Sequence, residues 1–373
     1  MNDSYPFPVP GLDDPRAGHP GCRDHEETGP EDPRFHFSLP LPEGWARLGE
    51  PGPAPSRENP LTLLARCRLA EEPEAEIVVT GRLLERDVAP ADLLLPDLER
   101  SGEEILRRRE IDSPDGRSID VLSRSRTERG MLVLRRSTLK RGSRMLVLHA
   151  AATEETYDRW ADRLAVAAAG LRFLEPGTWH SAEGLGTLAR SSPSDFLLFY
   201  PESWQVEGPD AAGTDVFSAS LVNRPQGLVV GRVDLAVVSR AARPDLRAVV
   251  DAYLGRLTAA GFEGPPVSPA PFPPPAAFQV AWEGVGERTS GDARVELRLR
   301  AGQRPEAWFC FSMMGPTRTS APDVWAVNRR ALELAFDLVA TPDVPMQGWI
   351  AEAIQRARRP PAQARPRSSA RRA

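Results

Sequence analysis

The chain carries one pattern of elements twice, and this repetition limits its fold more than any other feature of the sequence. Pro42-Glu43-Gly44-Trp45 closes an apolar run at 35–41, and Pro201-Glu202-Ser203-Trp204 closes another at 196–200. The two tryptophans lie 159 residues apart, which is close to the length of an ordinary domain. The sequence therefore predicts two similar units in tandem.

The elements that follow each tryptophan recur in the same order. Strand-like runs at 61–69 and 77–82 in the first copy match runs at 216–222 and 228–232 in the second. A helical pattern comes next in both copies, at 91–106 and at 245–260, and Gly261 marks the end of the second one.

A hairpin and a long helix complete each copy. The first hairpin is expected to turn at 140–143 and the second near Gly302. Closing helices are expected at 154–171 and 323–339, and Pro322 at the first helical position supports the start of the second, with Ser320 as a capping signal. Each copy is thus predicted as an α+β unit with three strands, a helix, three strands and a helix, and with a mainly antiparallel sheet flanked by helices.

Composition separates the two copies from a linker and two tails. Residues 1–34 hold eight acidic residues, three arginines and many Pro and Gly, so we expect a disordered acidic arm there. The domains are placed at 35–174 and 195–341, with a linker at 175–194. Residues 342–373 are expected to form a short helix and an arginine-rich, disordered tail.

The composition is that of a globular protein, with 41% apolar and 27% charged residues. The N-terminus lacks the basic and apolar regions of a secretory signal, and no apolar run reaches the ~20 residues that span a bilayer. Cys22, Cys67 and Cys310 are odd in number and widely spaced, which is typical of reduced thiols. The sequence therefore predicts a cytoplasmic protein with no transmembrane segment.

No motif indicates a reaction. The five histidines are not spaced to share a metal, and we interpret His149 as a half-buried strand residue. Residues 184–189 match a dinucleotide fingerprint in letters but lack the preceding strand. The adjacent acids Glu103-Glu104 and Glu154-Glu155 are expected on different sides of helices, as solvated residues. We therefore predict no enzyme, no cofactor and no metal, with a hydrolase of dispersed residues as a remaining alternative.

Two groups of residues are candidates for partner binding. Trp349, Ile350 and Ile354 fall on one helical face, which predicts a short helix that docks on its own domain or on a partner. Arg294 and Arg298 belong to a strictly alternating strand, whose polar face meets water or a partner.

Other conspicuous residues have simpler interpretations. Four tryptophans recur at matched positions and are interpreted as core anchors: Trp45, Trp160, Trp204 and Trp325. The proline-rich segment 264–275 is interpreted as a stiff spacer, with Phe272 fixing it in place and a recognition segment as the alternative. Seven arginines in 356–373 predict a solvated tail, and contact with nucleic acid or anionic lipid is the less favoured alternative.

The order of these elements resembles the PsbP-like α/β/α sandwich superfamily, and within it the DcrB-like group. The resemblance rests on Pro42-Glu43-Gly44-Trp45 with the strands, acidic-start helix, hairpin and closing helix that follow, and it covers 35–174 and 195–340. Ser203 replaces the glycine of this motif in the second copy. Families of this shape are largely non-enzymatic, and include photosystem assembly factors and chaperones that hold the hydrophobic N-terminal helices of type VI secretion effectors on a concave sheet.

The resemblance implies a non-catalytic chaperone or adaptor for a secreted effector with a hydrophobic N-terminal segment. Because those chaperones work as dimers, two fused copies imply a single-chain pseudo-dimer. A sheet that binds apolar helices should expose apolar side chains, whereas Arg294, Glu296, Arg298 and Arg300 line one face of the second hairpin. Either the second copy presents a different surface, or this polar face meets solvent. The alternative function is a structural or nucleic-acid-associated protein recruited through 356–372.

Overall fold

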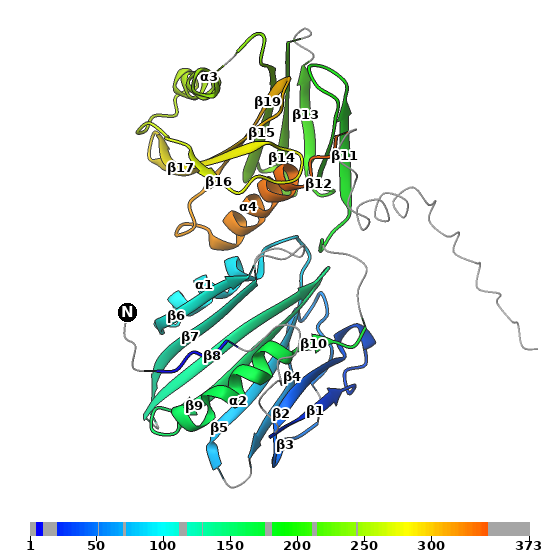
Figure 1. Cartoon of the computed structure of the whole chain (residues 1–373), viewed down its shortest axis with the longest axis vertical. Coiled ribbons are helices and arrows are strands. Elements are labelled where there is room, and N and C mark those ends of the chain that lie inside the picture. Colours follow the sequence, from blue (N-terminus) through cyan, green and yellow to red (C-terminus); the bar gives the residue numbers. More distant parts are fainter. Residues whose placement is uncertain are drawn as a thin grey trace, which may run out of the picture.

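The computed structural model describes residues 5–9, 21–50, 52–69, 72–111, 118–128, 130–175, 181–210, 215–243 and 245–341. Within these ranges the chain is an α+β protein with two seven-stranded antiparallel sheets and four α-helices. Figure 1 shows two units stacked along the long axis, each built around its own sheet. The predicted fold class, two antiparallel α+β units flanked by helices, is confirmed.

The first unit contains the blue to green elements of Figure 1. Its strands are β1 (Cys22–Glu27), β2 (Phe37–Pro42), β3 (Trp45–Arg47), β4 (Leu61–Leu69), β5 (Glu72–Leu83), β6 (Glu104–Ile111), β7 (Ser118–Thr127), β8 (Gly130–Arg141), β9 (Arg144–Thr153) and β10 (Arg172–Phe173). Its helices are η1 (Pro33–Phe35), α1 (Pro90–Arg100) and α2 (Tyr157–Gly170).

The second unit follows the same plan. Its strands are β11 (Leu185–Arg190), β12 (Phe196–Pro201), β13 (Gln205–Asp210), β14 (Val216–Asn223), β15 (Gly231–Ser239), β16 (Ala270–Phe272), β17 (Val280–Ser290), β18 (Ala293–Gln303) and β19 (Ala307–Pro316). Its helices are η2 (Pro225–Gly227), α3 (Leu246–Ala259) and α4 (Pro322–Asp337).

The two large sheets have the same strand order. The first runs β3-β4-β5-β9-β8-β7-β6 and the second runs β13-β14-β15-β19-β18-β17-β16. Each sheet takes three strands from before its first helix and four from after it, one strand more than the sequence pattern predicts. In each unit a strand that precedes the large sheet also pairs with the segment after the closing helix. In the first unit β2 pairs with β10, and in the second Leu197 of β12 forms a bridge with Ala340.

Each unit has an aromatic interior on one face of its sheet. In the first unit α2 packs on β2, β8 and β9, and the rings of Trp45 and Trp160 meet edge to face at 5.3 Å. In the second unit α4 covers β15 and β19, and Phe336 lies 5.3 Å from Phe311. Trp204 and Trp325 are also buried. Burial of such rings supplies much of the hydrophobic stabilisation of each unit.

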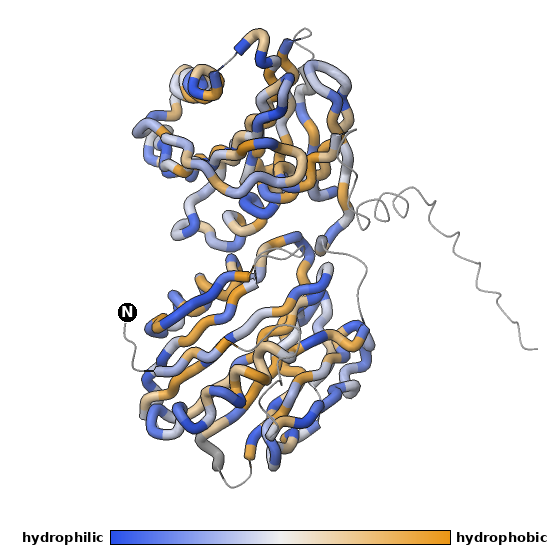
Figure 2. The backbone as a smooth tube through the Cα atoms, in the orientation of Figure 1, coloured by the Kyte–Doolittle hydropathy of each residue, from blue (hydrophilic) through white to orange (hydrophobic). Residues whose placement is uncertain are grey.

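The two units share part of one interior. Helix α1 of the first unit packs against α4 of the second, and Leu93 and Leu94 belong to the same apolar cluster as Phe309 and Phe336. Figure 2 shows apolar residues on both sides of this junction. Because apolar side chains cross the boundary, separation of the units would expose them to water.

The described part of the acidic arm is not unstructured. Cys22–Glu27 forms β1, which pairs along its whole length with β2, and Tyr5 is buried with its ring 6.2 Å from that of Tyr157. The polar sequence of β1 gave no strand period because an edge strand is held by its backbone hydrogen bonds as much as by apolar side chains.

Two other predicted boundaries were wrong. Helix α1 ends at Arg100, and the chain turns at Gly102, which has φ +71°. Glu104 therefore lies in β6 and Glu103 in the turn before it, so the expected helical faces do not exist. Glu154 and Glu155 likewise lie in a turn that precedes α2.

The match between 77–82 and 228–232 was also wrong. Residues 225–227 form η2, and Leu228 and Val229 are 69% and 50% exposed. Strand β15 begins only at Gly231, where a Cβ would lie 2.1 Å from the Asn328 side chain.

The second hairpin turns at 304–306, close to Gly302 as expected, but Gly302 itself lies inside β18 opposite Phe309. A Cβ on this glycine would lie 2.5 Å from the ring of Phe278. The close contact with this ring thus requires a glycine. In the sequence alone, such a glycine looks the same as one that marks a turn. No helix in the described ranges is long and apolar enough to cross a bilayer.

Candidate functional site

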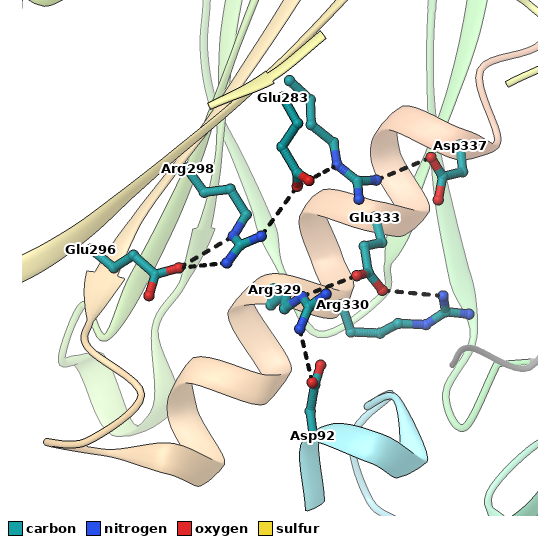
Figure 3. A network of polar contacts seen from close by, with 9 residues as sticks. Asp92, Glu283, Glu296, Arg298, Arg329, Arg330, Glu333 and Asp337 are labelled. Atoms are coloured by element: carbon teal, nitrogen blue, oxygen red, sulfur yellow. Dashed lines mark hydrogen bonds and ion pairs between the residues drawn. The ribbon is translucent and has the colours of Figure 1, made fainter. Parts of the chain in front are cut away.

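The arginine face of the second hairpin is partly covered, because Arg298 and Arg300 are held in ion pairs beside α4. Arg298 donates to Glu296 at 3.1 Å and to Glu283 at 3.2 Å, and Arg300 contacts Glu283 at 3.2 Å and Asp337 of α4 at 3.1 Å. Figure 3 shows this network beside α4. Burial raises the pKa of Glu283, but Arg300 and Arg298 outweigh it and hold that pKa below its usual value. The charges are therefore internal partners of α4.

The opposite face of the hairpin is also covered, because Leu297 and Leu299 pack with Val250 and Leu257 of α3. The polar face therefore meets water at Arg294, whereas Arg300 of the same face is buried against α4. Of the predicted partner-binding residues, Arg298 is engaged in this network and Arg294 is exposed at the start of β18. Trp349, Ile350 and Ile354 lie outside the described residues.

A part of the first sheet carries no helix. On the face opposite α2, helix α1 packs on β6, β7 and β8. The other half of this face, which we call the open face, displays Leu61, Leu63, Val78, Thr80 and His149 from β4, β5 and β9. The strand register places these five side chains on one side, because Leu63 is opposite Thr80 and Val78 is opposite His149.

The open face is apolar at its edge. Leu61 and Leu63 are 55% and 48% exposed, and Val78 is partly exposed beside them. Large aliphatic side chains at this exposure, grouped on one face of a sheet, are characteristic of surfaces that another molecule covers. Beside them, Arg66 of β4 and Glu76 of β5 form an ion pair at 2.6 Å, which gives the patch a polar margin.

His149 is neutral within the open face. Its Nδ1 accepts a hydrogen bond from Arg136 Nε at 3.1 Å, and its Nε2 lies 3.3 Å from Thr80 Oγ1. Arg136 also contacts Glu103 at 2.7 Å. Burial, followed by the charge of Arg136, lowers the pKa of His149 to about 4. No group of three or more metal-ligating side chains occurs in the described part of the chain. Both ring nitrogens of His149 contact side chains of neighbouring strands.

The low pKa of His149 makes stability depend on pH. The unfolded histidine has a pKa near 6.5 and so binds a proton more readily than the folded one. Its contribution to stability is complete above about pH 6.5 and is lost as the pH falls toward about 4. We expect urea unfolding of His149→Gln to depend less on pH than that of the native chain between pH 4 and 6.5. Parallel curves for the two proteins across this range would contradict the prediction.

The dinucleotide-like motif has no phosphate site. Residues 185–190 form β11, an antiparallel hairpin with β12, so no helix N-terminus follows the glycines. A Cβ on Gly186 would lie 2.5 Å from the ring of Tyr200, and one on Gly184 would lie 2.0 Å from the Glu202 carboxylate. Packing across the hairpin thus explains both glycines.

A charged cluster between the units was missed at the sequence level. Asp87, between β5 and α1, contacts Lys140 Nζ at 2.5 Å and Arg330 Nε of the second unit at 2.9 Å. The side chains of Asp87 and Lys140 are fully buried. Burial raises the pKa of Asp87, but Lys140 and Arg330 outweigh it and keep that pKa below its usual value.

The linker and α4 extend this cluster. The Ala182 amide donates to Asp87 Oδ1 at 2.8 Å, and Arg329 of α4 donates to Asp92 of α1 at 2.9 Å, as Figure 3 shows. Lys140 is the only lysine in the chain, which was the one signal that could have drawn attention to it. The cluster thus connects α1 and the segment before it with α4 of the second unit.

No protein-family model matches the chain, and no curated protein matches it. Solved structures give partial likenesses. A PsbP from Synechocystis is 10% identical with a TM-score of 0.31, over 41% of this chain and 92% of that protein. The Ran-binding protein Mog1p from Saccharomyces cerevisiae is 11% identical with a TM-score of 0.31, over 43% and 97%.

A third likeness extends over both units. The T6SS immunity protein TplEi from Pseudomonas aeruginosa is 14% identical with a TM-score of 0.23, over 88% of this chain and 98% of that protein. These TM-scores are too low to describe the chain by its likenesses. Its architecture is therefore described by its own strand order, which occurs twice in succession.

Proposed function

We propose that the chain is a non-catalytic protein-binding protein, a chaperone or adaptor, whose partner docks on the open face of the first sheet. The observation that carries this proposal is the pair of exposed leucines, Leu61 and Leu63, on a sheet surface that α1 leaves uncovered. The proposed partner is a secretion effector with an apolar segment, which would cover these leucines.

The chemistry of the open face suits an apolar segment of a protein. Thr80 and His149 satisfy each other, and His149 is uncharged at neutral pH, so docking would not bury an unpaired charge there. Burial of one leucine side chain contributes about 1.5–3 kcal/mol. An amphipathic helix laid on the sheet would contact several such side chains at once.

Substitution of Leu63 by glutamate tests this proposal. The new charge would be desolvated in the complex. We therefore expect the amount of partner that copurifies with Leu63→Glu to be lower than with the native chain by about tenfold or more. The measurement is quantitative mass spectrometry of proteins that copurify with the tagged chain from its own cells after mild crosslinking. Val285→Glu is the matched control, because Val285 is 52% exposed on β17 of the second unit.

The outcomes separate the proposals. Loss of one stoichiometric partner in Leu63→Glu, with retention in Val285→Glu, supports docking on the open face. Equal recovery from all three proteins, or no stoichiometric partner at all, contradicts it. Removal of 356–373 should leave the partner in place; loss of the partner on removal of this tail would favour recruitment through its arginines instead.

A further inference from the structure

Helix α3 stands away from the second sheet and encloses a cavity. The cavity has a volume of about 970 Å³ and lies between α3 and the face formed by β14, β15 and β19. Two apolar clusters hold the helix at its sides. Val250 belongs to one cluster with Leu299 of β18, and Val249 belongs to the other with Val238 and Trp308. Figure 1 shows α3 as a separate layer beside its sheet.

The walls of the cavity are mainly apolar. They include Val216, Ala236, Val238, Val250, Leu257 and Leu299. In the first unit, by contrast, α1 packs directly on β6, β7 and β8, and its leucines belong to the same apolar cluster as Ile119 and Val121. The strands of the first sheet that are equivalent to β14, β15 and β19 are β4, β5 and β9, which form the open face. The standoff of α3 therefore encloses space over a face that α1 leaves uncovered in the first unit.

One end of the cavity is polar and internally paired. Asp234 accepts hydrogen bonds from Ser220 and Arg232, each at 2.6 Å, and from the Tyr253 hydroxyl at 3.3 Å. The carboxylate thus has three donors and one cationic neighbour. It offers little attraction to a cationic ligand, because its charge is already balanced.

The rim carries an excess of positive charge. Arg243 and Arg256 are exposed residues of the lining, and the Arg256 guanidinium lies 5.6 Å from the centre of the Tyr253 ring. The other acid of the lining, Glu207, is paired with Arg224 at 2.7 Å. Arginine binds carboxylate, sulfonate and phosphate groups through its fixed fork of donors.

From these features we propose that the cavity under α3 binds an anionic amphiphile, a small molecule with one apolar chain or ring body and an acidic end. The apolar body would lie between α3 and the sheet, and the acidic end would lie at the rim, beside Arg243 before the start of α3 or beside Arg256 in its last turn. The volume falls within the range of small-molecule sites. This site is separate from the open face of the first unit and does not depend on the protein partner.

The headgroup can be tested with three probes of equal chain length. We expect the purified full chain to bind dodecanoate at a one-to-one ratio, about tenfold or more tighter than dodecanol or dodecyltrimethylammonium, by calorimetry below the micelle concentration. The double variant Arg243→Gln/Arg256→Gln should weaken dodecanoate about tenfold and leave dodecanol unchanged. Arg247→Gln is the matched control, because Arg247 is an exposed arginine of α3 with an 87% exposed side chain and lies outside the lining.

The location can be tested in the native chain and in a filled cavity. Cys310 lines the cavity, and burial raises the pKa of its thiol to about 12, so alkylation should be slow and dodecanoate should slow it further. The alkylation rates of Cys22 and Cys67 should not change. Ala236→Phe should abolish binding, while Ala259→Phe, on the exposed side of α3, should not.

Several results would overturn the proposal. Equal affinity for the three headgroups, or an unchanged dodecanoate affinity in the double arginine variant, would show that the rim does not select an anion. Unchanged alkylation of Cys310 in saturating dodecanoate would place the ligand elsewhere, whether or not Ala236→Phe folds.

Discussion

Asp87→Asn should lower the free energy of unfolding by about 3–5 kcal/mol. The substitution leaves Lys140 and Arg330 without their common carboxylate, while the asparagine can still accept from the Ala182 amide. Lys140 is fully buried and Arg330 nearly so, and a buried cation that loses a carboxylate partner is much less stable than the same cation in water. Because Arg330 belongs to the second unit, the loss should also weaken the contact between the units.

Urea unfolding followed by tryptophan fluorescence measures this effect. Glu76→Gln is the matched control, since it breaks an ion pair whose arginine is 49% exposed and should cost no more than about 1 kcal/mol. Adding Lys140→Met to Asp87→Asn should recover part of the loss, because one of the two buried cations that lost the carboxylate is removed. A cost near that of Glu76→Gln would show that the cluster does not join the units.

Asp87 should also make the stability of the protein sensitive to acid. Its folded pKa is below its ordinary value because Lys140 and Arg330 outweigh burial. A depressed carboxyl pKa gives stability that is present above the unfolded pKa, near 3.9, and is lost as the pH falls through the folded value. Asp87→Asn should therefore flatten the loss of stability below about pH 4.

Trp45→Ala should destabilise the first unit by about 3–5 kcal/mol. Trp45 has no exposed surface, and its ring meets that of Trp160 edge to face at 5.3 Å. Its removal would leave a cavity beneath α2 and would also end a ring contact worth about 0.5–1.5 kcal/mol. Trp204→Ala should have a cost of the same order in the second unit, because that ring is also buried.

Trp282→Ala serves as the control for the tryptophan series. Trp282 is only partly buried and contacts Trp308 at 5.9 Å, so its removal should cost clearly less than that of Trp45. Urea unfolding gives the costs of all three variants on one scale. A cost for Trp45→Ala that is no larger than the cost for Trp282→Ala would contradict its role as an anchor of the first interior.

The repeated motif and the alternating runs were sufficient to predict two antiparallel α+β units. The range predicted for β4, 61–69, agrees with the structure, and α3 lies within one residue of its predicted range. Strands of this kind are determined by side-chain alternation over a few neighbours, and helix ends by local caps such as Asp245. The positions of the buried tryptophans followed from the same local logic, since large aromatic rings at matched positions belong in matched interiors.

The sequence by itself thus determined the architecture, because strand and helix periods are encoded within each segment. The tertiary structure alone decided how segments far apart meet. It paired β1 with β2, and it joined Asp87 to Arg330 across 243 residues. It also covered part of the arginine face with α4 and held α3 off its sheet. Such contacts depend on the shape and charge that distant residues present to one another, which no local period records.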